Sequence, residues 1–158
     1  MGLENFDKNN WNIDDSSLKA NESIVNPVET AIRLAISHKA SDVHVKSNRA
    51  TRLRIKTELK KTDVMATADD LYAFCKKHMP QDIAKIDKFA NKEIFSIDST
   101  VVCYKRRLRL HLYRSNNDVC CTLRLLSENI PPLANLNLPM SLAKFIDMKT
   151  GLVLICGA

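Results

Sequence analysis

The sequence predicts an α+β domain in which an antiparallel sheet carries its helices on one face. The spacing of the apolar residues alternates between a period of 3.6, typical of helices, and a period of 2, typical of strands. The resulting order is one helix, two strands, two helices and three strands. Short polar segments join several of these strands, which suits antiparallel pairing because parallel strands need a long crossover.

Length and composition are typical of one water-soluble domain with a tail. The chain has 158 residues, of which 45% are apolar and 27% charged. No apolar run approaches the roughly 18 residues of a membrane span, and the polar N-terminus lacks the character of a secretion signal. The net charge of the chain is +6. The first 30 residues hold six acidic and two basic side chains, a charge of −4, so the remaining residues carry a charge of +10. A domain this basic would suit nucleotide phosphates, nucleic acid or an anionic membrane surface.

The five cysteines give no sign of a disulfide framework or a metal site. They lie at positions 75, 103, 120, 121 and 156, an odd number without a C-x-x-C pair. Cys120 and Cys121 are adjacent on a predicted strand, so they point to opposite faces and cannot hold one ion together. We expect reduced thiols in a cytosolic protein and no structural zinc.

The first firm element is a helix over about residues 27–39. Asn26 is a suitable N-cap, Pro27 fits the first helical position, and Glu29 occupies the acidic position of a capping box. The apolar positions that recur at helical spacing are Val28, Ala31, Ile32, Ala35 and Ile36.

Two strands follow, over about residues 40–46 and 51–59, and should pair as a hairpin around 47–50. The period changes to 2, so Val43 and Val45 face the core while their neighbours face outward. The outward-facing residues of the two strands are His44, Lys46, Arg52, Arg54 and Lys56.

A second helix begins at Thr67, with Asp70 in its first turn, and ends at Pro80. His78 lies on its apolar stripe, where a histidine is more often a satisfied core or boundary residue than a ligand. A shorter helix is expected over about residues 81–89.

Three further strands are predicted over about 93–103, 106–114 and 119–126. The first should be broken around 98–100, and the last two form a hairpin across 115–118. One face of the sheet then buries aliphatic side chains and the other displays arginines. In the middle one of these three strands, Leu108, Leu110 and Leu112 alternate with Arg107, Arg109, His111 and Tyr113.

The C-terminal part predicts a linker and the start of another domain. Two prolines at 131 and 132 cannot continue a central strand, and a short helix is expected over about 139–147. The apolar run 152–156 predicts a strand buried on both faces, and Gly157 stands where a G-x-x-x-x-G-K-[ST] phosphate loop would begin, a weak signal on its own. We interpret this strand as truncated. The expected segments are a flexible polar arm (1–23), the α+β domain (24–128), a linker (129–138) and the start of a further domain (139–158). As an alternative to a flexible arm, a short docking helix could form around Trp11.

Three segments in this order resemble the secretion ATPase superfamily of type II secretion and type IV pilus motors. Residues 40–45, Ala-Ser-Asp-Val-His-Val, are similar to its A-S-D-[IL]-H signature, and residues 52–55, Arg-Leu-Arg-Ile, to its R-x-R-[VI] strand. The third segment runs from Arg-Leu-Arg-Leu at 107–110 to the strand at 151–157, which in that family leads into the Walker A loop. The resemblance covers about residues 26–158. One departure is Lys-Thr-Glu at 56–58, where the family usually has an Asp-Gly turn.

The resemblance implies a PAS-like N-terminal domain followed by the first strand of a RecA-like ATPase domain. The full-length protein would be a hexameric ATPase that uses ATP and Mg²⁺ to power pilus assembly, pilus retraction or secretion. This fragment would lack the Walker A and B residues, so no catalytic residue, metal or bound nucleotide is expected in it. The implied partners are the other subunits of the ring, an inner-membrane platform protein and cytoplasmic assembly proteins, but not DNA or RNA. The implied location is the cytoplasm, at the inner membrane through those partners.

The resemblance also points to site residues. In that family nucleotide lies between this domain and the RecA-like domain, and arginines of this domain help to neutralise phosphate, for which a planar, always charged guanidinium is suited. The linker borders adenine and ribose, which makes Leu133 and Asn135 candidates. A solvated strand face or salt bridges between subunits are the alternative roles for the arginines. The phosphate-binding candidates are Arg52, Arg54, Arg107, Arg109 and Arg124.

The acid and the histidine of the first signature invite an acid–base role, but their position favours a structural one. Ser41, Asp42 and His44 lie at a helix-to-strand junction, where Ser41 and Asp42 can satisfy backbone donors. Packing between subunits is the second possibility.

Two other classes of function stay open. A nucleic-acid module would use the same basic face, but aromatic residues make up only 6% of the chain and none is interleaved with the basic strand residues as in a base-stacking platform. A free-standing PAS-like sensor would need an apolar ligand pocket.

Overall fold

A computed structural model describes residues 12–13, 25–127, 129–154 and 156. The chain forms two compact units, Met1–Leu126 and Ser127–Ala158, and each is described by itself. Apart from Asn12–Ile13, the expected N-terminal arm lies outside the described residues. The expected domain boundaries stay a prediction.

The first unit is an α+β domain, as predicted. Its sheet has the order β1-β4-β3-β2-β7-β6-β5. All neighbours are antiparallel except β1, a two-residue strand that pairs in parallel with β4. The elements are β1 (Asn12–Ile13), α1 (Pro27–Ser37), β2 (Asp42–Lys46), β3 (Arg49–Ile55), β4 (Glu58–Ala66), α2 (Ala68–His78), η2 (Pro80–Asp82), α3 (Ile83–Ala90), β5 (Ser96–Cys103), β6 (Arg106–Ser115) and β7 (Asp118–Leu125).

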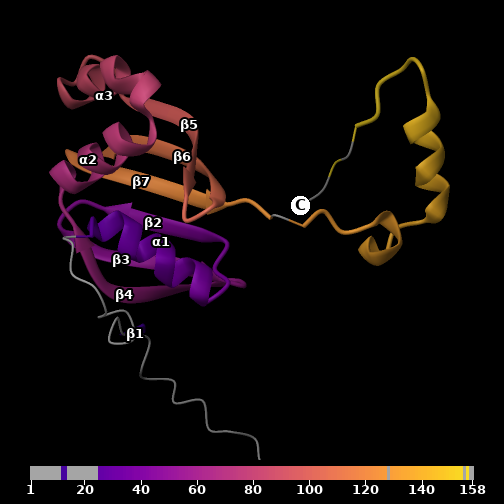
Figure 1. Cartoon of the computed structure of the whole chain (residues 1–158), viewed down its shortest axis with the longest axis horizontal. Helices are drawn as coiled ribbons and strands as arrows, with labels where there is room; N and C mark the ends of the chain where they lie inside the picture. Colours follow the sequence, from indigo (N-terminus) through magenta and orange to yellow (C-terminus); the bar gives the residue numbers. More distant parts are fainter. Residues whose placement is uncertain (1–11, 14–24, 128, 155, 157–158) are drawn as a thin grey trace, which may run out of the picture. The chain divides into compact units, whose positions relative to one another are not determined.

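Helices α1, α2 and α3 cover one face of the sheet (Figure 1). The core lies between the two layers, where alternate strand residues meet the apolar stripes of the helices. Its largest fully buried side chains include Ile32, Phe74, Phe89, Leu108, Leu110, Leu112 and Leu123. Because strand residues alternate between faces, the remaining side chains of these strands form an opposite face, which we call the open face.

The helix starts follow the predicted caps, with one correction. Asn26 accepts a hydrogen bond from the backbone N–H of Val28 at 2.8 Å, and Thr67 with Asp70 forms a complete capping box. Glu29, which the sequence assigns to a capping box of α1, instead turns its carboxylate to Lys77 and His78 on α2. The position is also buried, so this acid links two helices rather than closing one.

The hairpin turns use residues with positive φ. Asn116 and Asn117 (φ 51° and 69°) join β6 to β7, and Tyr104 and Lys105 (φ 50° and 60°) join β5 to β6. Two central residues with positive φ give the twist that matches an antiparallel pair. The predicted β2–β3 hairpin is also present, with Asn48 at φ 59° in its loop.

Two strand predictions are wrong. The strand expected over 51–59 ends at Ile55, and after a turn with Lys56 at φ 56° a separate strand, β4, runs to Ala66. Its lysines hide the pattern, because β4 lies near the sheet edge, where charged residues are common. The break expected around 98–100 is absent: β5 pairs continuously with β6 from Ser96 to Cys103, and its polar residues lie on a solvated edge strand.

The second unit contains two 3₁₀ helices, η3 (Leu133–Leu136) and η4 (Met140–Asp147). The helix expected over 139–147 is therefore present in 3₁₀ form. The strand expected over 152–156 is wrong for residues 152–154 and 156, which have no regular structure. The described part of this unit offers no other strand with which they could pair, and an isolated strand leaves its backbone groups without partners. Among the described residues, no helix is long and apolar enough to cross a membrane.

Candidate anion-binding face

The five candidate arginines all lie on the open face of the sheet. They come from β3, β6 and β7, and each alternates with a leucine that is buried under the helices, such as Leu53, Leu108 and Leu123. The alternation that predicted an arginine face is therefore present. The candidates are Arg52, Arg54, Arg107, Arg109 and Arg124, and whether any of them binds phosphate stays a prediction.

The strand register aligns three of these arginines with one acid. Asp42 on β2 lies opposite Arg54 of β3 on one side and Arg124 of β7 on the other, and Arg124 lies opposite Arg109 of β6. Cross-strand neighbours on one face lie close enough for their side chains to interact. The result is a row across four adjacent strands, which we call the arginine row: Arg54, Asp42, Arg124 and Arg109.

Asp42 anchors the arginine row. Its side chain is only 4% exposed and contacts Nε of Arg124 at 2.8 Å and Nε of Arg54 at 3.5 Å. The hydroxyl of Ser41 donates to its second oxygen at 2.8 Å. Burial by itself raises the pKa of the Asp42 carboxyl, but the hydrogen bonds from Arg124 and Ser41 outweigh it and leave the pKa below its ordinary value. Asp42 is therefore ionised at neutral pH and fixes guanidinium groups whose outer parts face solvent, since the Arg124 side chain is 66% exposed.

A shallow hollow of about 200 Å³ lies over this row. Arg109, Arg124, His111 and Thr122 line it together with the acids Asp42 and Asp98. Asp98 contacts His111 at 3.1 Å and Arg109 at 3.9 Å. Two guanidinium groups and an imidazole thus converge on one depression, and two carboxylates hold them in position. Such an arrangement suits an anion with several oxygens.

A second hollow of about 410 Å³ lies further along the same face. Its basic side chains are His44, Lys46, Arg49 and Arg52. Of these four residues, the sequence predicts only Arg52 to bind phosphate. It places Lys46 on the outward face without a binding role, and it places Arg49 in the turn between two strands. Arg52 and Arg107 lie outside the arginine row, so the structure does not gather the five candidates at one point.

His44 is half-buried between the two hollows. Burial, which outweighs the attraction of Asp42, lowers the pKa of this histidine, and the positive charges of Arg54 and Arg124 lower it further. It is therefore neutral at neutral pH. Ser41, Asp42 and His44 were expected to have a structural role. Asp42 does accept hydrogen bonds, but from side chains rather than from the backbone donors that the sequence suggested.

The linker candidates lie in the second unit. Leu133 begins η3 and Asn135 lies within it, where the N–H of Asn135 donates to the carbonyl of Pro132 at 2.9 Å. Their expected contact with adenine or ribose stays a prediction.

Comparisons with known proteins identify the fold. No family model matches the sequence, and no curated protein matches it. Solved structures do. The chain has the same fold as part of the pilus retraction motor PilT and of the ATPase DotB. The crystal structure of the pilus retraction motor PilT with bound ADP matches at a TM-score of 0.55 and 21% sequence identity, over 74% of this chain and 34% of that one.

Two structures of the ATPase DotB give the same result. That of Legionella pneumophila matches at a TM-score of 0.53 and 18% identity, over 80% of this chain and 36% of that one. That of Yersinia pseudotuberculosis matches at 0.50 and 13% identity, over 75% of this chain and 34% of that one. The chain thus spans about a third of the length of these structures. The resemblance predicted from the sequence is confirmed at the level of the fold.

Proposed function

We propose that this chain is the N-terminal domain of an ATPase that drives a type IV pilus or a related secretion machine, and that its open face meets nucleotide phosphate. The arginine row carries the second half of this proposal, because it presents Arg109 and Arg124 at one hollow with their positions fixed by buried or paired acids. The likeness to PilT and DotB supports the first half and favours a motor over a nucleic-acid module or a free-standing sensor.

In this proposal the catalytic residues belong to an adjoining RecA-like domain, which also supplies the Mg²⁺ site. Arg109 and Arg124 contact phosphate oxygens of ATP bound by that domain, and Asp42 acts as a positioning residue for Arg124. The contact draws the two domains together when ATP is bound and weakens after hydrolysis. Repeated around a hexameric ring, this cycle moves an inner-membrane platform protein, which places the protein in the cytoplasm at the inner membrane.

The coding sequence beyond Ala158 tests the motor assignment directly. The proposal expects a G-x-x-x-x-G-K-[ST] loop that begins at or near Gly157, where a nucleotide-binding strand would end. A natural stop codon at that point would contradict it.

ATP hydrolysis by the protein with its ATPase domain tests the arginines separately. Arg109→Ala and Arg124→Ala should each lower kcat/KM by about tenfold to a hundredfold, because a charge-assisted hydrogen bond contributes about 1.5–3 kcal/mol. Lys88→Ala removes an exposed charge on α3, away from the open face, and serves as the matched control. Unchanged kinetics in both arginine variants would remove the open face from the mechanism and leave the motor assignment standing.

A further inference from the structure

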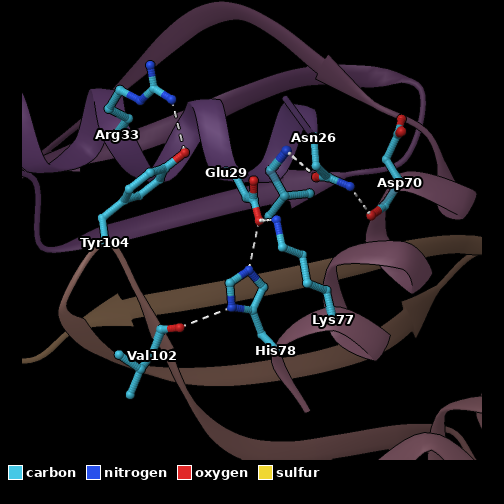
Figure 2. A network of polar contacts seen from close by, with 9 residues as sticks. Asn26, Glu29, Arg33, Asp70, Lys77, His78, Val102 and Tyr104 are labelled. Atoms are coloured by element: carbon cyan, nitrogen blue, oxygen red, sulfur yellow. Dashed lines mark hydrogen bonds and ion pairs between the residues drawn. The ribbon is translucent and has the colours of Figure 1, made fainter. Parts of the chain in front are cut away.

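A second cluster of polar side chains lies on the helix-covered side of the sheet. Glu29 of α1, His78 at the end of α2 and Cys103 at the end of β5 bring a carboxylate oxygen, a ring nitrogen and a sulfur within 4.8 Å of one another. Figure 2 shows the carboxylate of Glu29 meeting Lys77 and His78, with the carbonyl of Val102 on the other side of the imidazole. The three side chains of the cluster come from three elements that are far apart in the sequence.

The imidazole of His78 faces an acceptor on each side. Its Nδ1 lies 3.0 Å from the carbonyl oxygen of Val102, and its Nε2 lies 2.8 Å from Oε1 of Glu29. The ring packs against Phe74, with centroids 4.5 Å apart, which limits its rotation. A neutral imidazole has a single N–H and can satisfy only one of these acceptors. A shared proton makes the contact between Nε2 and Glu29, and a metal ion that replaces this proton would bind the same two atoms.

The contact between Nδ1 of His78 and the carbonyl oxygen of Val102 is of the kind that metal-binding histidines make. Such a residue donates its other N–H to a carbonyl or carboxylate, which fixes the ring and the tautomer. Nδ1–H to Val102 fills this role and leaves Nε2 directed toward Glu29.

We propose that Glu29, His78 and Cys103 form a binding site for one zinc ion. Oxygen, nitrogen and sulfur ligands together match the chemistry of Zn²⁺, and bond lengths of about 2.0–2.3 Å place tetrahedral ligand atoms about 3.3–3.8 Å apart. The observed separations run from 2.8 Å, between Glu29 and His78, to at most 4.8 Å, and small side-chain movements bring them into this range. Water supplies the fourth ligand. The site is independent of the nucleotide function proposed above.

Binding releases protons and displaces a competing cation. Burial, and then the negative charge of Glu29, raise the pKa of the Cys103 thiol to about 11, so the free thiol keeps its proton at neutral pH. As zinc binds, the thiol proton leaves and an S–Zn bond forms; any proton on Nε2 of His78 leaves in the same way. Lys77, whose Nζ lies 2.8 Å from Glu29, is 64% exposed and can turn to solvent.

Cobalt(II) is the probe, because a thiolate bound to it gives a charge-transfer absorption that other ligands do not. The tag-free chain carrying Cys156→Ser, which removes the exposed thiol, should show this band and saturate it at one ion per chain; zinc should abolish it by displacement. Cys103→Ser should remove the band, and Glu29→Gln should weaken binding at least roughly tenfold. Cys120→Ala, which changes a cysteine outside the site, should keep it.

Lys77→Ala provides the test that does not depend on a buried residue. Removing this cation from Glu29 should raise cobalt affinity several-fold, whereas a purely structural network would show no cobalt binding to raise. Absence of the band in the parent chain, or a band that survives Cys103→Ser, would overturn the proposal. Circular dichroism of each variant separates loss of the site from loss of the fold.

Discussion

Nε of Arg124 on β7 donates to Oδ1 of Asp42 on β2 at 2.8 Å, across 82 positions of sequence. The contact joins β2, the middle strand of the sheet, to its neighbour β7 and holds one arginine of the open face in place. The same carboxylate contacts Arg54 from the other side.

Replacing this acid should make the fold less stable in a pH-dependent way. Asp42→Asn should lower the free energy of unfolding at pH 7 by about 1–3 kcal/mol, since it replaces the buried carboxylate that accepts from Arg124 and Ser41 with a neutral amide. The pKa of Asp42 is lowered in the folded state, so its contribution is present above the unfolded pKa of about 3.8 and is lost as the pH falls below it. Urea denaturation at a series of pH values should show the difference shrinking below about pH 4. A constant difference down to pH 2 would contradict this account.

The two contacts of Glu29 with α2 should contribute unequally to the free energy of unfolding. Lys77 is largely exposed, so Lys77→Ala should change the unfolding free energy little. Glu29→Gln should cost more, about 1–3 kcal/mol, because the buried carboxylate also accepts from His78. Chemical denaturation of both variants at pH 7 compares them. Equal costs would mean that the exposed ion pair, not the buried contact, joins α1 to α2.

Shortening a side chain in the core between the sheet and the helices should destabilise the fold strongly. Leu110→Ala deletes a fully buried side chain and should lower the unfolding free energy by about 2–5 kcal/mol. Leu59→Ala is the matched control, because Leu59 is 46% exposed on β4 and should change stability by less than about 1 kcal/mol. Similar thermal shifts for the two variants would place the core elsewhere.

The turn between β6 and β7 depends on backbone conformation rather than on contacts. Asn117 has φ 69°, so Asn117→Val should destabilise the fold by about 1–2 kcal/mol, whereas Asn117→Gly should leave it unchanged or more stable. The two melting temperatures measure this difference. A destabilising glycine together with a tolerated valine would mean that the asparagine side chain, and not φ, matters.

The sequence predicts those features that depend on local patterns. The alternation around Leu108 and Arg109 places one set in the core and the other on the open face, and Thr67 and Asp70 are enough to locate the start of α2. These signals lie within a few residues of one another, which is why they can be read without a structure.

Features that depend on register could not be predicted. Nothing near Asp42 shows that it will lie between Arg54 and Arg124, because only strand pairing brings them together. The same holds for Glu29. Its sequence position is that of a capping residue, and only the packing of α2 against α1 shows that it contacts Lys77 and His78 instead. Strand β4 was missed because it lies near the sheet edge, where exposed lysines interrupt the apolar alternation.

The strand order also sets when the domain can finish folding. β2, β3 and β4 form one consecutive meander, β5, β6 and β7 form another, and only the β2–β7 pairing joins them. Each meander contains near-neighbour contacts that form early, whereas the seam requires residues about 80 positions apart to meet. On the ribosome, β2 therefore keeps one backbone edge unpaired until β7 has been synthesised, and closing that seam completes the sheet.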